Sequence, residues 1–404
     1  MSHNRLEATE ALRLFPEQGD FGLRKVEDGV VGVGVSWIGA WARSVSSFTN
    51  RVLGLCCACW SHQCVSRSRA GIQGFGAMLC MLESGYCRVS RREGWSRLIV
   101  KDDLPFRKLF SGHESFSLRY PWLKKGYEQI RKDSGAFSAD DAVVRLGVGK
   151  NMVQSIRYWC LATRMLVSES PSHGRVLSPS ALGSRLLSDT GWDPYVEDEG
   201  TAWLLHWNLC STDSWTPTWY WAFNFLPSAA FSQQTLVALL LDWVRELGWD
   251  DVAASTIKRD MECMIHSYCT RRIGLKAPLE SISCPLQGLG LVEWDAGSGL
   301  LHWPTGNRPS LPVAVFTYAL CEYWWKTQPH RSSLDIQEVC FAEGSPGRVF
   351  RLDEESVLDY VNQIAAVTAD SLILEKTPLV NRLVAKKVVT QSLGFDILDA
   401  YYSN

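Results

Sequence analysis

The chain has 404 residues, of which 46% are hydrophobic, which is enough for a sizeable core and excludes wholesale disorder. Its 41 basic and 43 acidic side chains leave a net charge of −2, which excludes a polybasic protein. At about 150 residues per domain, the length predicts two or three domains. No run of about 20 apolar residues and no secretory leader pattern is present, so we expect a cytoplasmic protein that contacts no membrane. The 13 cysteines show no regular framework and are expected to be reduced thiols.

The first hundred residues differ in composition from the rest. Residues 29–100 contain eight arginines and six cysteines, but no lysine and only two acids. One group of metal-ligating side chains stands out: Cys56, Cys57, Cys59, His62 and Cys64. Zinc sites use two ligand pairs separated by a loop, whereas this group is a single crowded cluster. We therefore expect residues 1–105 to be a non-native or disordered extension without metal or cofactor, and a metal site is the alternative.

A basic segment follows the extension. Residues 106–185 hold 13 basic and 6 acidic side chains, a net charge of +7. Residues 117–132 predict a first helix, with Pro121 in an early position that suits a helix start. Ser138 is a typical N-cap and predicts a second, short helix over 139–146. The segment therefore starts with two consecutive helices.

The next predicted elements complete the order of a known structural motif. Residues 147–149 read Gly-Val-Gly and predict a tight turn, and a third helix is expected over 150–165. Apolar runs at 166–168 and 176–178 predict a hairpin. Helix, short helix, turn, helix and hairpin are typical of a winged helix-turn-helix, whose third helix reads the major groove. We predict such a module over 106–188.

The third predicted helix has one apolar and one polar side on a helical wheel. The polar side of this helix and the predicted hairpin, which is the wing of the motif, supply the predicted DNA contacts. These are Lys150, Asn151, Gln154, Arg157 and Tyr158 on the helix and Arg175 in the hairpin. Asn151 and Gln154 can form paired hydrogen bonds with adenine, while basic side chains meet guanine edges or phosphates. The charge of +7 favours duplex DNA as a partner. A polar helix face is equally typical of a solvated helix or a protein adaptor, so that alternative stays open.

An acidic, tryptophan-rich segment comes next. Residues 186–254 hold one basic and ten acidic side chains, a net charge of −9. Stacked tryptophans can bind bases, but the negative charge repels a phosphate backbone. We interpret the tryptophans as packing residues and residues 189–230 as connecting helices.

The remaining chain predicts further helices and hairpins. Amphipathic helices are expected over 232–248 and 255–268, followed by a hairpin over 289–303. We interpret 231–308 as a second winged-helix-like module with an architectural or protein-binding role. Residues 309–404 are expected to form a helical, degenerate winged-helix-like module. The fold class is therefore mainly α with small β wings, in tandem winged helix-turn-helix modules.

An enzyme is the third hypothesis, because His113 beside Glu114 has groups for acid–base or metal chemistry. The zinc motif H-E-x-x-H needs a second histidine where this chain has Ser117. No G-x-S-x-G nucleophile elbow is present. We therefore predict no catalytic residue and a capping or packing role for His113, with a nuclease or sulfur-transfer enzyme as the alternative.

Several motifs, in this order, resemble those of the bacterial domain-of-unknown-function 4007 family. They lie at 110–116 (FSGHESF), 141–153, 155–160, 203–207 (WLLHW), 218–224 (TWYWAFN) and 345–350 (SPGRVF). The resemblance covers residues 106–400, and family members typically open close to the first motif, from which residues 1–105 depart. The resemblance implies a setting among cassettes for DNA sulfur modification (phosphorothioation) and phage defence, and identifies no catalytic residue.

Together these observations predict a DNA-binding accessory protein of such a system. Its expected partners are duplex DNA and proteins of a modification or defence complex. The alternative is an adaptor subunit that makes no direct DNA contact.

Overall fold

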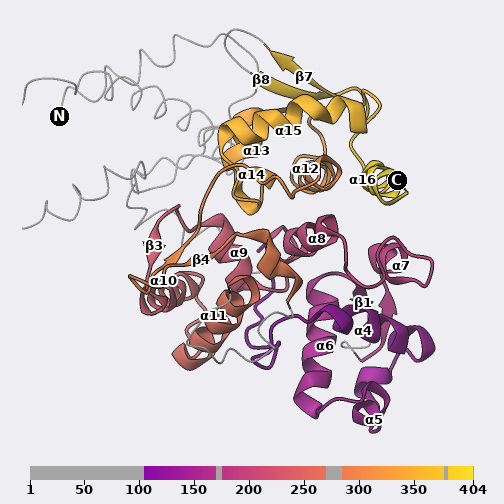
Figure 1. Cartoon of the computed structure of the whole chain (residues 1–404), viewed down its shortest axis with the longest axis vertical. Helices are drawn as coiled ribbons and strands as arrows, with labels where there is room; N and C mark the ends of the chain where they lie inside the picture. Colours follow the sequence, from indigo (N-terminus) through magenta and orange to yellow (C-terminus); the bar gives the residue numbers. More distant parts are fainter. Residues whose placement is uncertain (1–103, 170–174, 270–283, 377–380, 404) are drawn as a thin grey trace, which may run out of the picture. The chain divides into compact units, whose positions relative to one another are not determined.

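The computed structural model describes residues 104–169, 175–269, 284–376 and 381–403. They all belong to the second of two units into which the chain divides, Ser90–Asn404. The cysteine cluster at 56–64 and nearly all of the predicted extension lie outside the described residues. The described residues are mainly helical, with small antiparallel sheets (Figure 1). The predicted fold class is confirmed to that level, and the predicted domain boundaries remain predictions.

The basic segment contains the predicted helices and hairpin in the predicted order. Its elements are α4 (Tyr120–Lys132), the 3-10 helix η2 (Ala136–Ser138), α5 (Ala142–Leu146), α6 (Lys150–Ala162), β1 (Leu166–Ser168) and β2 (Leu177–Pro179). The two strands pair antiparallel, with Leu166 opposite Pro179. α4 packs along α6, which gives this region its core.

Three predicted helix boundaries in this segment are wrong. The first helix, α4, begins at Tyr120 rather than at residue 117. Ser138 is not an N-cap, because it lies in η2, where buried Phe137 turns the chain inward, and α5 begins only after Asp141. α6 ends at Ala162 rather than at residue 165. The left-handed backbone of Arg164, with φ of 62°, stops the helix there.

Three helices follow in the acidic segment: α7 (Ala181–Leu187), α8 (Glu199–Cys210) and α9 (Pro217–Asn224). Nearly every residue of α8 and α9 is buried, including Trp203, Trp207, Trp219 and Trp221. A helix that is apolar all round belongs in a protein interior. The packing role predicted for these tryptophans is therefore confirmed.

The rest of the chain repeats a common order of elements: a helix, a strand, a group of helices and a hairpin. After α9, the first repeat has β3 (Ala230–Phe231), α10 (Gln233–Glu246), α11 (Ala254–Tyr268), η4 (Pro285–Leu289), β4 (Glu293–Trp294) and β5 (Leu301–His302). The second has α12 (Val313–Thr327), β6 (Ser333–Asp335), α13 (Ile336–Phe341), α14 (Pro346–Val349), α15 (Glu354–Val367), β7 (Leu372–Lys376) and β8 (Asn381–Ala385). The strand orders are β3-β5-β4 and β6-β8-β7, so the last strand is central in both sheets. A final helix, α16 (Gln391–Tyr402), packs on α12.

The interior is apolar but contains ionic groups with partners. The seven described cysteines are buried, as predicted. On α12, the buried carboxylate of Glu322 accepts hydrogen bonds from Arg164 and the Trp207 indole and pairs with Lys326 at 2.8 Å. Burial opposes ionisation of Glu322, yet Arg164 and Lys326 hold its pKa below the usual range. This network ties α12 to α8 and to the turn after α6.

Candidate nucleic-acid interface

The exposed end of α6 is the central feature of this candidate interface. Gly147 ends α5 in the left-handed region, with φ of 60°, and Gly149 stands directly before α6. Both glycines are exposed, and a Cβ on either would meet no neighbouring atom. The turn therefore projects the first residues of α6 from the protein surface.

The N-terminus of α6 carries positive potential. No side chain caps it, and its first turn contains no acid. The first N–H groups of a helix have no partner within the helix and favour anions. Lys150 stands at this end, so a lysine charge and the helix dipole act in the same place.

Only some of the predicted contact residues lie on this surface. Lys150, Asn151 and Gln154 are exposed, and Arg157 is half-buried. Tyr158 is 4% exposed, so its predicted outward position is wrong. The helical wheel failed there because a segment distant in sequence covers that side of α6.

The β1–β2 hairpin is described only in part. Arg175 is exposed beside β2, while residues 170–174 lie outside the described part of the chain. A backbone hydrogen bond from Glu169 to Val176, 3.1 Å long, continues the pairing of β1 and β2 beyond the strands. Arg175 is thus placed at the base of the hairpin loop.

The charge of the basic segment is partly neutralised by acids from elsewhere in the chain. Lys124 pairs with Asp189 at 2.8 Å, and Arg164 pairs with Glu322 at 2.7 Å. Arg131 also pairs with Asp189. The field at the surface is therefore weaker than the net charge of +7 implies.

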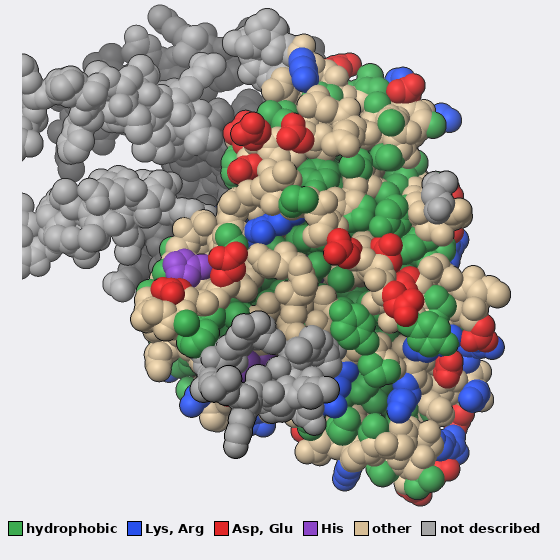
Figure 2. Space-filling model, in the orientation of Figure 1, with side chains coloured by type: hydrophobic (Ala, Val, Ile, Leu, Met, Phe, Trp, Pro, Cys, Tyr) green, Lys and Arg blue, Asp and Glu red, His purple; other side chains and the backbone are tan. Residues whose placement is uncertain are grey.

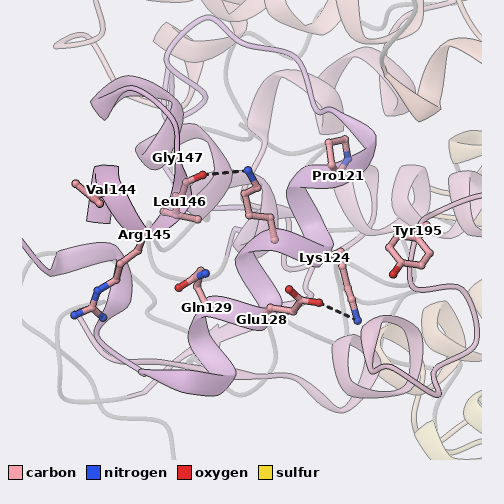
Figure 3. Close-up of a pocket in the computed structure, with 10 residues that line it drawn as sticks. Pro121, Lys124, Glu128, Gln129, Val144, Arg145, Leu146, Gly147 and Tyr195 are labelled. Atoms are coloured by element: carbon pink, nitrogen blue, oxygen red, sulfur yellow. Dashed lines mark hydrogen bonds and ion pairs between the residues drawn. The ribbon is translucent and has the colours of Figure 1, made fainter. Parts of the chain in front are cut away.

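A surface cavity of about 450 Å³ lies between α4 and α5 (Figure 3). Lys124, Val144, Arg145 and Tyr195 are among the residues that line it. Its cations are engaged, since Lys124 reaches Glu128 and Asp189, and Arg145 pairs with Asp133 and Asp141. We find no ligand chemistry that this cavity favours.

His113 lies at the centre of a buried polar cluster. Its side chain is 0% exposed, and Nε2 lies 2.8 Å from Oδ1 of Asp260 on α11. Nδ1 accepts a hydrogen bond from the backbone N–H of Ser115 at 3.0 Å. Because Nδ1 accepts, the ring proton is on Nε2 and is donated to Asp260. The packing role predicted for His113 agrees with this burial, while Glu114 is exposed.

Asp260 fixes the loop that contains His113. Its carboxylate also accepts hydrogen bonds from the Ser111 backbone N–H and the Thr218 hydroxyl. Ser111, Glu114 and Ser115 have φ of 57°, 50° and 68°, a conformation that side chains rarely adopt. Three non-glycine residues in this conformation persist only where contacts such as those of Asp260 hold them.

The same loop explains the burial of Tyr158. A Cβ on Gly112 would lie 2.5 Å from Cδ2 of Tyr158, so this glycine allows the loop to cover α6. The Phe116 carbonyl accepts hydrogen bonds from the Trp159 indole on α6 and the Cys263 thiol on α11. The 110–116 motif thus joins α6 to α11.

Sequence reasoning missed Asp260. On α11, Asp260 follows Ile257 by three residues and precedes Met264 by four, within the apolar stripe of that helix. An acid on an apolar helix face indicates a buried partner, and this signal was available in the sequence. It could not identify His113 as that partner.

A comparison with known protein families gives a match that includes this site and nearly all of the described chain. The family model described as "Protein of unknown function (DUF4007)" matches residues 110–402. The chain belongs to this family.

Two solved structures are similar to this DUF4007 chain. They are described as "Magnesium ion-bound SspB crystal structure" and "SspB crystal structure". Each has 33% sequence identity and a TM-score of 0.68, covering 74% of this chain and 89% of the other. No curated protein matches the chain.

Membrane spans and metal clusters are both missing from the described part of the chain. No helix in the described ranges is long and apolar enough to cross a membrane. The same ranges contain no group of three or more His, Cys, Asp or Glu side chains placed to hold a metal ion.

Proposed function

We propose that this DUF4007 chain is a DNA-binding accessory protein that reads duplex DNA with α6. The observation that carries the proposal is the exposed, uncapped N-terminus of α6, with Lys150, Asn151 and Gln154 on its surface. Lys150 supplies a phosphate contact, and the two amides supply paired hydrogen bonds to base edges. Arg157 and Arg175 extend the contact toward the DNA backbone, and Tyr158 is left out because it is buried.

The order of elements around α6 supports this reading. α4, α5 and α6 followed by the β1–β2 hairpin is the order of a winged helix-turn-helix, in which the third helix enters the major groove. The two later repeats add a strand before their helices, and that strand pairs with the last strand of the hairpin. We propose that all three are winged-helix modules and that the first contacts DNA.

The proposed setting is a bacterial DNA sulfur-modification or phage-defence system, with the protein in the cytoplasm. It rests on the family resemblance of the motifs at 110–116, 203–207, 218–224 and 345–350. In such a system a DNA-binding subunit would bring partner proteins to the duplex. Partner proteins of that complex are therefore part of the proposal.

One of the two similar structures is described as magnesium-bound, which raises the question of a magnesium site in this chain. Magnesium needs several oxygen ligands in near-octahedral geometry. The described residues contain no group of three or more His, Cys, Asp or Glu side chains placed to hold a metal ion, and we assign no magnesium site among them. His113 is 0% exposed and engaged by Asp260. The proposal assigns it no catalytic role and has no metal-dependent step.

A second candidate function is an adaptor that binds proteins without touching DNA. The observation that favours it is a group of carboxylates, at Asp193, Glu197 and Asp198, that form no ion pair with a described Lys or Arg. These side chains repel DNA and attract basic protein surfaces. Protein binding by these acids does not exclude DNA binding by α6, because the residues involved are different, so the two candidates differ in whether the chain contacts DNA.

The test is fluorescence-anisotropy binding of the full chain to a duplex at about 50 and 200 mM salt. Because phosphate contacts release counterions, we expect a steep loss of affinity between those concentrations. The experiment is repeated with sulfur-modified duplex to test the proposed setting. No binding at the lower salt would reject DNA reading, and a partner pulldown that survives nuclease treatment would then support the adaptor.

A further inference from the structure

A second surface cavity has an aromatic and acidic lining. Its volume is about 390 Å³, and it is lined by Trp192, Asp193, Glu197, Asp198, Tyr401 and Tyr402. The lining joins the loop before α8 to the C-terminal end of α16. We propose that this cavity binds an arginine side chain on the surface of a partner protein. The proposal does not depend on DNA contact by α6.

One wall of the cavity is aromatic. The rings of Trp192 and Tyr402 stack with centroids 5.0 Å apart and planes within 9°, and Tyr401 meets Tyr402 edge-on at 4.8 Å. The Trp192 indole N–H donates to Asp399 at 3.0 Å, and the Tyr402 hydroxyl bonds Thr201 at 2.8 Å. These bonds fix the rings, which remain only partly buried. Fixed, partly exposed rings suit a flat cation.

The other wall is acidic, and no ion pair with a described residue neutralises it. Both carboxylate oxygens of Asp193 accept backbone N–H groups, at 2.9 and 3.0 Å, which shapes the loop. One oxygen of Asp198 accepts from the Gly200 N–H and the Tyr401 hydroxyl. Glu197 is exposed and is left for an incoming donor. Within the described ranges, no Lys or Arg forms an ion pair with any of these three acids.

These three acids lie within the acidic segment, where other acids have cation partners. Asp189, Asp213 and Asp251 each pair with a lysine, so their charges are compensated within the fold. Burial raises the pKa of Tyr401, and the carboxylates of Asp198, Glu199 and Asp193 raise it further, as expected where the potential is negative. Figure 2 shows acidic side chains beside hydrophobic ones in the region of α7 and α8.

Arginine fits this chemistry better than the other cations. A guanidinium is planar, stacks on aromatic faces and offers several N–H donors to carboxylates in one plane. A lysine ammonium is a compact, strongly hydrated charge that gains less from stacked rings. A metal ion needs several converging ligands, and the described residues contain no group of three or more His, Cys, Asp or Glu placed to hold one. A phosphate backbone is repelled.

The test measures binding of hexa-arginine and hexa-lysine peptides to the full chain by calorimetry at low salt. We expect the arginine peptide to bind more tightly than the lysine peptide. Glu197→Gln combined with Tyr402→Leu should weaken arginine binding about tenfold, because an exposed ion pair and a cation–π contact each contribute a few-fold. Glu246→Gln, which removes an exposed acid on α10, is the matched control and should leave binding unchanged.

Folding is checked by comparing duplex binding and thermal unfolding of the variants with those of the wild type. Tyr402→Phe, which keeps the ring, should bind the arginine peptide as the wild type does. Three outcomes overturn the proposal: no binding of the arginine peptide, equal binding of both peptides, or equal affinity of the Glu197→Gln/Tyr402→Leu double variant and the Glu246→Gln control for the arginine peptide. If the wild type does not bind the duplex, α6 is rejected as a DNA reader, and the inference about the cavity still stands.

Discussion

His113 and Asp260, 147 residues apart in the chain, form a fully buried hydrogen bond of 2.8 Å between the ring Nε2 and a carboxylate oxygen. This bond holds the 110–116 motif against α11, and the same motif covers the C-terminal half of α6. Tyr158 lies on the same side of α6 as Asn151 and Gln154, so this loop limits the face proposed to read DNA to the first turns of the helix.

Removal of Asp260 should destabilise the protein strongly. In Asp260→Ala the His113 ring, the Ser111 N–H and the Thr218 hydroxyl lose their acceptor in the interior. We expect the free energy of unfolding to fall by about 3–5 kcal/mol, measured by urea denaturation. The control is Asp242→Ala, an exposed acid paired only with Arg245, for which we expect a change within about 0.5 kcal/mol. Equal small losses in both variants would show that the bond does not hold the loop.

The glycine of the motif should not tolerate a methyl group. A Cβ on Gly112 would lie 2.5 Å from the Tyr158 ring, so Gly112→Ala must shift the loop or the ring and should cost about 1–3 kcal/mol. Gly135→Ala is the matched control, because its nearest neighbour would be an Asp133 oxygen at 3.5 Å. Thermal unfolding of the two variants distinguishes them. An unchanged melting temperature for Gly112→Ala would contradict the packing described.

The amides of α6 should determine sequence preference. Asn151→Ala with Gln154→Ala removes the proposed base contacts and leaves Lys150 in place. Each lost paired contact should reduce discrimination between a preferred and a scrambled duplex by about 1–3 kcal/mol, while salt-dependent binding persists. Competition binding measures this, with Asn362→Ala, an exposed amide on α15, as the control. Unaltered discrimination in the double variant would place the reading surface elsewhere.

Glu322 should give the stability a defined acid dependence. Its pKa is held low in the folded state, so it contributes stability above the ordinary glutamate pKa of about 4.3 and loses it as pH falls through the folded value. Glu322→Gln should therefore be less stable than the wild type at pH 7, and the difference should shrink below about pH 4. Denaturation measured from pH 7 to pH 3 tests this. A difference that stays constant over that range would mean that Glu322 does not titrate as described.

Local patterns predicted much of the fold. The order of helices in the basic segment, the β1–β2 hairpin and the burial of the tryptophans followed from periodicity, glycine turns and charge. The predicted helix boundaries were wrong where the local preference of a residue conflicted with tertiary packing. Ser138 is a good cap in isolation, but the buried Phe137 places it in a 3-10 turn.

The site was predicted less well, for a physical reason. Lys150, Asn151 and Gln154 were placed correctly on the surface, because the first turns of α6 project from the protein. Tyr158 was misplaced because the 110–116 loop covers it, and Asp260 was missed because its partner is 147 residues away. A helical wheel reports one helix and contains no information about such long-range contacts. The cavity at Trp192 and Tyr402 likewise joins segments that the sequence keeps far apart.

The central claim is that α6 contacts DNA phosphates, and the salt dependence of duplex binding tests it most directly. The slope of log affinity against log salt is measured for the wild type, Lys150→Ala and Lys150→Ala with Arg157→Ala. Each lost phosphate contact should reduce the slope by about one and weaken binding. Lys258→Ala, which removes an exposed lysine from α11, should leave both unchanged. Equal slopes and affinities for the wild type and the α6 variants would contradict the account.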